Sequence, residues 1–178
     1  MNLGISILSK EVREKTADFL LTKPVSRCKI MTAKLLSTLT SLVITDVIYL
    51  IITLIMLSLI QSGAYNLKIF LMISVTLFFV QLLFLSLGVI VSVVVPKIRS
   101  VLPISLGTVF GFFILNLLDS VIGNKATRYL IPFLYYDSAY IIKNASYETS
   151  FVVLEIVFVV AAIGASYLIY SEKDIHTV

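Results

Sequence analysis

The chain has too few charged residues to be an ordinary soluble domain. Only 13% of its 178 residues are charged, 59% are hydrophobic, and the mean hydropathy is +1.05. A core of this size cannot hide so much apolar surface, so lipid must be part of the solvent of the folded chain. The net charge of +4 is not clustered with aromatic residues along a face, and we therefore expect no nucleic-acid partner.

Residue types and motifs that carry chemistry are scarce. The single cysteine, Cys28, permits no internal disulfide, and the single histidine, His176, rules out a His-x-x-His metal site. The sequence has no Gly-x-x-x-x-Gly-Lys-Ser/Thr phosphate loop and no Gly-x-Ser-x-Gly nucleophile elbow. We therefore predict that the chain is not an enzyme and holds no metal or cofactor of its own.

Four apolar runs are each long enough to cross a membrane. They cover about residues 35–60, 69–95, 101–122 and 151–170, and about 20 residues of helix span a hydrocarbon layer of ~30 Å. Backbone groups in lipid must bond within their own segment, so helices are expected rather than strands. The sequence predicts an all-α integral membrane protein, with a polar segment at residues 1–34 and a transmembrane domain at residues 35–178.

A long polar, charge-dense stretch, residues 9–29, precedes the first run. Ser9 is expected to cap a short helix here, and Pro24 to end it, because proline lacks an N–H and disfavours helix in the residue before it. Ser26 is expected to cap the next helix. One face of the short helix carries, at helical spacing, Val12, Thr16, Phe19 and Leu20. Charged side chains lie around the remainder: Glu11, Glu14, Lys15, Asp18 and Lys23.

This short amphipathic helix has two interpretations. It could lie on the membrane surface with its apolar face in lipid, or it could dock into a groove of a protein partner. A helix on a lipid surface usually has a basic polar face. The mixed charges here favour a protein partner.

Lysine and arginine residues indicate the orientation. Seven lie in the segment before the first run, and others follow the second and fourth runs at Lys97, Arg99 and Lys173. The opposite side has four: Lys68, Lys125, Arg128 and Lys143. The richer side is cytoplasmic, so we predict a multi-pass protein of the cell membrane with the docking helix and the C-terminus in the cytoplasm.

Polar residues inside the runs mark possible sites. Asp46 and Glu155 are ionisable groups within apolar runs, where they are costly and usually face a partner or water. Glu155 lies about one turn inside the outer face, where water could reach it. Small and hydroxyl residues form stripes, such as Ser41 and Thr45 in the first run and Gly107-x-x-x-Gly111 in the third. We interpret the stripes as helix-packing faces, with a translocation pathway as the alternative.

Residues 124–150 are too long for a turn and are rich in tyrosine. We predict two short interfacial helices on the outer side, one on each side of Pro132. The tyrosine rings suit the headgroup layer, because each has an apolar body and a polar tip. The five tyrosines of this segment are Tyr129, Tyr135, Tyr136, Tyr140 and Tyr147.

The docking segment resembles a known motif. Residues 14–27, EKTADFLLTKPVSR, followed by Lys34, are similar to the acidic-x-Thr-x-x-x-Leu-Leu-x-x-Pro-Val-Ser-Arg pattern of permease subunits of type-2 ABC transporters. Residues 129–133 and 170–175 are similar to the last outer loop of that family and to the exit from its sixth span. The family normally has six spans, so the chain resembles an N-terminally truncated permease that retains spans three to six.

The resemblance implies a function. The segment would be the coupling helix, which docks on a separate ATPase subunit that binds the ATP, and two permease chains would pair as a homo- or heterodimer in the bilayer. The implied docking residues are Glu11, Glu14, Lys15, Thr16, Phe19, Leu20, Pro24, Ser26 and Arg27. ATP hydrolysis would then drive transport, and the family tendency is export. The alternative is a scaffold or immunity-type membrane protein whose cytoplasmic helix binds another partner; an intramembrane enzyme would need catalytic pairs that the sequence does not show.

Overall fold

The computed structural model describes residues 1–13, 27–60, 66–95, 98, 100–122 and 127–172. The long helices are α1 (Asn2–Arg13), α3 (Arg27–Ile60), α4 (Leu67–Val94), α5 (Val101–Ile122) and α7 (Thr149–Glu172). Between α5 and α7 lie two 3-10 turns, η1 (Thr127–Tyr129) and η2 (Pro132–Leu134), and the short helix α6 (Ser138–Asn144). The described part of the chain contains no strand, which confirms the predicted all-α class.

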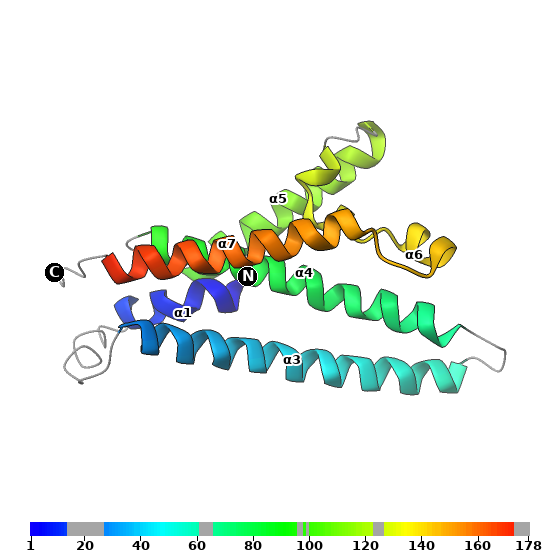
Figure 1. The fold of residues 1–178 in the computed structure, drawn as a ribbon, viewed down its shortest axis with the longest axis horizontal. Helices are drawn as coiled ribbons and strands as arrows, with labels where there is room; N and C mark the ends of the chain where they lie inside the picture. The colour runs from blue at the N-terminus through cyan, green and yellow to red at the C-terminus, as the bar shows by residue number, and fades with distance from the viewer. Residues whose placement is uncertain (14–26, 61–65, 96–97, 99, 123–126, 173–178) are drawn as a thin grey trace.

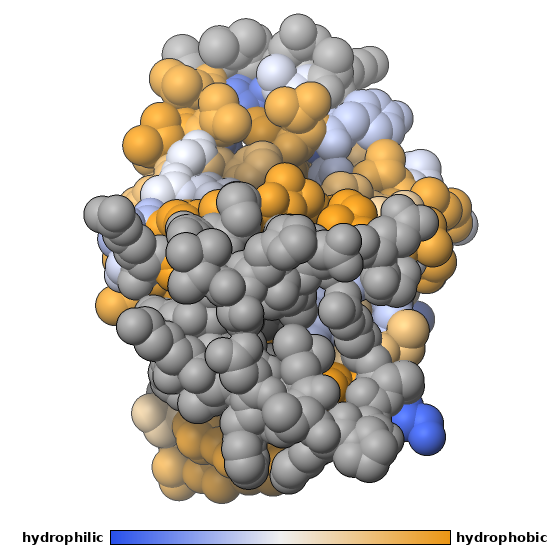
Figure 2. Space-filling model, turned by 90° about the vertical axis from the view of Figure 1, so that its left-hand side faces the viewer, coloured by the Kyte–Doolittle hydropathy of each residue, from blue (hydrophilic) through white to orange (hydrophobic). Residues whose placement is uncertain are grey.

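Four of these helices are long and apolar enough to cross a membrane, as the hydropathy predicts. The candidate spans are Cys28–Leu59, Leu67–Val94, Val101–Ser120 and Thr149–Tyr170. Large hydrophobic side chains are exposed on all four, as expected for helices that face lipid. Figure 2 looks onto the end of the bundle where α3 begins, and shows hydrophobic residues along its sides.

The four spans alternate in direction. The start of α3, the end of α4 and the end of α7 lie at the same end of the bundle, and α6 lies at the other (Figure 1). We refer to the latter as the α6 end and to the former as the α3-start end. Helices α3, α4 and α7 run side by side, whereas α5 diverges from them towards the α6 end (Figure 1).

Helix α1 packs against α4 through two glycines. A Cβ atom on Gly88 would lie 2.5 Å from the Met1 carbonyl oxygen and 3.0 Å from the Gly4 Cα, and a Cβ on Gly4 would overlap the Leu85 carbonyl oxygen. Real Cβ atoms essentially never come so close to backbone. Only glycine at both positions allows the two helices to approach to this distance.

The predicted N-terminal cap at Ser9 is wrong. Ser9 lies inside α1, where its hydroxyl donates a hydrogen bond of 2.7 Å to the Ile5 carbonyl oxygen. A serine in the middle of a helix can bond back to its own helix in this way, so the cap chemistry that Ser9 offers is not used. Helix α3 begins at Arg27, directly after Ser26, where the sequence predicts that the next helix starts. The polar residues that precede the apolar run near residue 35 belong to the same helix.

Candidate functional site: the docking segment and two buried carboxylates

The predicted docking residues fall mostly outside the described part of the chain. The docking residues outside the described part of the chain are Glu14, Lys15, Thr16, Phe19, Leu20, Pro24 and Ser26. Of the remaining two, Glu11 belongs to the last turns of α1, and Arg27 is the first residue of α3. What the structure describes is therefore the pair of helices that leads into and out of the docking segment.

These two flanking helices are joined directly. The Lys34 ammonium group on α3 donates a hydrogen bond of 2.8 Å to the Ile7 carbonyl oxygen on α1. Ile7 also belongs to a buried cluster with Met31, Val89, Val93 and Tyr170. The cluster draws on α1, α3, α4 and α7, so both flanks of the docking segment rest on the same core.

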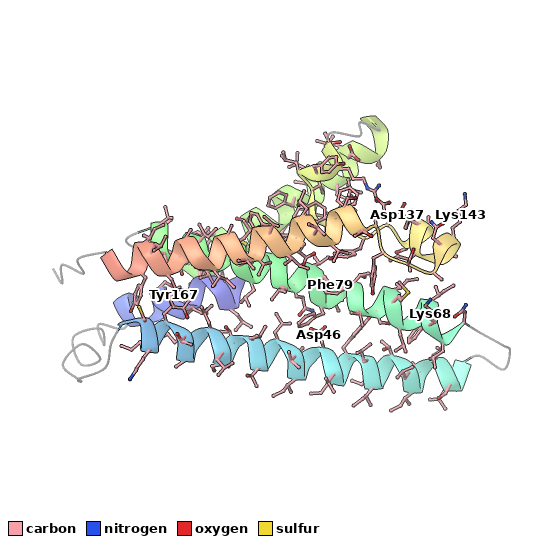
Figure 3. The ribbon with its side chains drawn as sticks, viewed as in Figure 1. Asp46, Lys68, Phe79, Asp137, Lys143 and Tyr167 are labelled. Carbon is pink, nitrogen blue, oxygen red and sulfur yellow. The ribbon has the colours of Figure 1, made fainter. Side chains whose placement is uncertain are left out.

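A second polar contact ties α3 to the last span at this end. The hydroxyls of Thr32 on α3 and Tyr167 on α7 lie 2.8 Å apart, and Thr32 also donates to the Cys28 carbonyl oxygen. Figure 3 shows Tyr167 on the face of α7 turned towards α3. A displacement of the start of α3 would therefore also displace α7.

Asp46 lies near the middle of the α3 span, on the side that faces α4 (Figure 3). The residue is only 7% exposed, and its Oδ2 atom has no hydrogen-bond partner among the described residues. It lines a cavity of about 190 Å³ between α3 and α4, together with Ser74 and five apolar residues. The sequence predicts that Asp46 faces a partner or water, and for this oxygen no partner is seen among the described residues.

Glu155 on α7 is buried rather than wet, so the expectation that water reaches it is wrong. It is 2% exposed, and one carboxylate oxygen accepts a hydrogen bond from the Tyr136 hydroxyl. The other oxygen, Oε1, has no partner among the described residues. Glu155 is covered in part by Tyr136, whose hydroxyl bonds to it near the start of α7.

The Tyr136 ring is held by aromatic neighbours. It stacks on Phe79 of α4, with ring centres 5.3 Å apart, and meets the edge of Tyr147 at 5.8 Å. The Tyr147 hydroxyl donates to the Met72 carbonyl oxygen at 2.8 Å. Burial raises the pKa of Tyr136, and the hydrogen bond to Glu155 and its charge raise it further. The phenol therefore remains a donor at neutral pH.

Short helical elements lie before and after Pro132, as predicted, but there are three of them rather than two, and one begins at Pro132 itself. Three of the tyrosines contact protein. Tyr135 is buried against Leu83 and Phe151, and its hydroxyl donates to the Tyr129 carbonyl oxygen at 2.7 Å. Burial, followed by the charge of Glu155, raises the pKa of the Tyr135 phenol. Tyr136 and Tyr147 likewise pack on Phe79. The Tyr129 side chain is exposed, although its ring centre lies 5.2 Å from that of Phe151.

An ion pair fixes this segment to the start of α7. The Arg128 guanidinium donates to Glu148 Oε1 at 2.8 Å and to the Leu134 carbonyl oxygen at 3.2 Å. The same guanidinium lies over the Phe151 ring, 4.4 Å from its centre. Arginine suits this position because its planar guanidinium can donate hydrogen bonds in its plane and stack its face on an aromatic ring.

The predicted packing stripes have different fates. On α4 the predicted stripe is Ser74, Gln81, Gly88 and Ser92; Gln81 is partly buried and the other three are buried, as a packing face should be. On α3, Ser41 and Thr45 are exposed, and the Thr45 hydroxyl donates to its own helix. On α5, a Cβ on Gly107 or Gly111 would meet no described atom within 4 Å. Among the described glycines, the pair that packs closely is Gly4 with Gly88, which lie in different helices and show no sequence motif.

The fold and these sites define a multi-pass α-helical membrane protein whose polar segment emerges between two joined helices. The family model described as ABC-2 family transporter protein matches residues 1–175. The chain belongs to this family and is a permease, the membrane component of an ABC transporter rather than its catalytic unit. No curated protein and no solved structure is similar enough to the chain to count as a match.

Proposed function

We propose that the chain couples ATP hydrolysis on a separate ABC ATPase subunit to the export of a substrate across the cell membrane. The observation that carries this proposal is the position of residues 14–26. They lie in a chain that the ABC-2 family model covers from residue 1 to residue 175, and their two flanking helices share one core cluster. Because both flanking helices contribute to this cluster, a displacement of residues 14–26 would be transmitted to α1, α3, α4 and α7.

In this mechanism the docking segment is the contact with the ATPase. Phe19 and Leu20 are the hydrophobic anchors, Glu11, Glu14 and Arg27 form the rim that sets the fit, and Pro24 is the corner before α3. The other proposed docking residues are Lys15, Thr16 and Ser26. Closure of the ATPase favours one of two arrangements of the bundle. The bond from Lys34 to Ile7 keeps α1 and α3 together during this movement.

A pair of double substitutions tests the docking. Phe19→Asp with Leu20→Asp places two charges on the predicted apolar face, and we expect it to abolish co-purification of the ATPase subunit while membrane insertion is kept. Ala17→Asp with Thr22→Asp is the control, since it adds the same charge outside the predicted apolar face and at variable positions of the motif. If the first variant co-purifies the ATPase as well as the wild type does, the docking assignment is refuted.

The orientation can be tested at the single cysteine. Cys28 is exposed at the start of α3, directly after the docking segment. If that end is cytoplasmic, a membrane-impermeant maleimide should label Cys28 in inside-out vesicles but not in intact cells. Asn144→Cys in a Cys28→Ser background, exposed on α6, should show the reverse pattern. Labelling of Cys28 from outside intact cells would contradict the proposed mechanism, because the ATPase works in the cytoplasm.

We also propose that a second permease chain pairs with this one through α5. This helix diverges from the bundle (Figure 1), and the face that carries Gly107 and Gly111 has open space where a neighbouring helix could approach closely. Gly107→Leu with Gly111→Leu should therefore lower the fraction of dimer in crosslinked membranes. Gly164→Leu, on an equally open position of α7, is the control.

A further inference from the structure

The cavity between α3 and α4 is an apolar hollow within the membrane-spanning part of the bundle. Its apolar lining residues come from both helices and are Val43, Val47, Leu50, Val75 and Phe78. Asp46 and Ser74 complete the lining, but the cavity presents almost no polar surface, so their polar atoms do not face it. All the lining residues lie inside two of the candidate spans, which places the cavity at the depth of the hydrocarbon layer.

The chemistry of the walls excludes a polar occupant. A buried water needs several polar partners, and the walls offer almost no polar surface to bond one. An ion would lack partners in the same way, and a charge in apolar surroundings is costly. An empty hollow is also unfavourable, because the atoms of its walls lose their dispersion contacts. The cavity therefore matches a neutral hydrocarbon group.

The volume of the cavity selects among hydrocarbon groups. An apolar cavity of about 150 Å³ can hold benzene, and this one is about 190 Å³. At the same volume per carbon atom it accommodates a stretch of about seven methylene groups. A transmembrane helix, about 10–12 Å across with its side chains, is too wide to enter. Val43 and Val47 are 43% and 48% exposed, so a thin, flexible chain can reach the cavity from the lipid-facing side of α3.

We propose that this cavity binds one acyl chain of a membrane lipid, with about seven methylene groups packed against Val75 and Phe78. The bilayer supplies such chains at this depth. Most of the α3 span is exposed, and the bound chain fills the gap between this helix and α4. Binding needs no ATPase subunit, so the outcome of this experiment is independent of the docking experiment.

The test uses the full chain reconstituted in nanodiscs of a phosphatidylcholine that carries a diazirine in the middle of one acyl chain. One sample is irradiated directly, and a second is irradiated after extraction and washing in detergent; peptide mass spectrometry then locates the lipid adducts. We expect adducts at Val75 and Phe78 in both samples. Ile48 and Ile52 are exposed and do not line the cavity, so their adducts should fall at least about tenfold on washing.

Two variants test whether the retained lipid occupies the cavity. Val75→Phe fills the space and should abolish the wash-resistant adducts at Phe78. Leu77→Phe adds a similar bulk at an exposed position of α4 outside the cavity lining and should keep them.

The wild-type comparison needs no variant to fold. The proposal is overturned if washing removes the adducts at Val75 and Phe78 as completely as those at Ile48 and Ile52, or if Val75→Phe retains the wash-resistant adducts at Phe78. It is equally overturned if the wild type shows no lipid adduct in the cavity even before washing, which would indicate that a side chain from another protein chain fills it.

Discussion

Replacing Gly88 by alanine adds one methyl group at the closest contact between α1 and α4. Its Cβ would lie 2.5 Å from the Met1 carbonyl oxygen and 2.9 Å from the Ile5 backbone nitrogen. Both neighbours are backbone atoms, so no side chain can rotate away to make room. Helix α1 must shift as a body, and its shift would carry Ile5 and Ile7 out of their buried positions.

The expected magnitude follows from two opposing effects. Extra methyl groups in a packed interior cost about 1–3 kcal/mol, whereas replacing a mid-helix glycine by alanine gains about 0.5–1 kcal/mol. Gly164 on α7 provides the matched control, because its Cβ would meet no described atom within 4 Å. Gly164→Ala gains helix propensity without the cost of overpacking, so Gly88→Ala should be less stable than Gly164→Ala by about 1–3 kcal/mol.

The assay compares the unfolding midpoints of the two variants and the wild type in one detergent. We expect Gly164→Ala to be at least as stable as the wild type, and Gly88→Ala to be less stable than Gly164→Ala. Gly88→Ala should also co-purify less ATPase, because a displaced α1 moves one flank of the docking segment. Gly164→Ala should retain the ATPase at the wild-type level.

A reciprocal substitution sharpens the test. Gly4→Ala would press on the Leu85 carbonyl oxygen from the other side of the same contact. Once one methyl group has separated the helices, the second should cost little, so the double variant should be far from additive. If Gly88→Ala and Gly164→Ala unfold together, the close approach of α1 and α4 does not exist, and the reasoning about the flanks fails with it.

Three further predictions concern the polar contacts. Tyr136→Phe removes the hydroxyl that donates to buried Glu155 and should destabilise the chain by about 1–3 kcal/mol, whereas Tyr129→Phe, at an exposed ring, should have little effect in the same unfolding assay. The pKa of Tyr136 is raised above its ordinary value of 10. The stability contributed by the neutral phenol should therefore be complete below pH 10 and be lost as the pH rises further. In a pH titration followed by absorbance at 295 nm, one tyrosine should ionise at higher pH than the others, and Tyr136→Phe should remove that step. Lys34→Met deletes the bond to the Ile7 carbonyl oxygen and should cost about 1 kcal/mol and reduce ATPase co-purification, unlike Lys29→Met, whose side chain is exposed.

The sequence by itself determined the class, the spans and the family. Length and hydropathy are enough to locate the four membrane-crossing helices, because the hydrocarbon layer demands about 20 apolar residues in each. The polar motif before the first long span pointed to the family that the match over residues 1–175 shows. The role of residues 14–26 in docking remains a prediction, since these residues lie outside the described part of the chain.

Only the tertiary structure decided which faces meet. Gly107-x-x-x-Gly111 has the sequence of a packing motif but open space around it, whereas Gly4 and Gly88 make the tight contact from two separate helices. Glu155 was expected to be wet and is instead covered by Tyr136, which lies 19 residues away in the chain. The physical reason is that lipid and helix interior are equally apolar, so hydropathy shows which segments enter the membrane but not which of their faces contact protein.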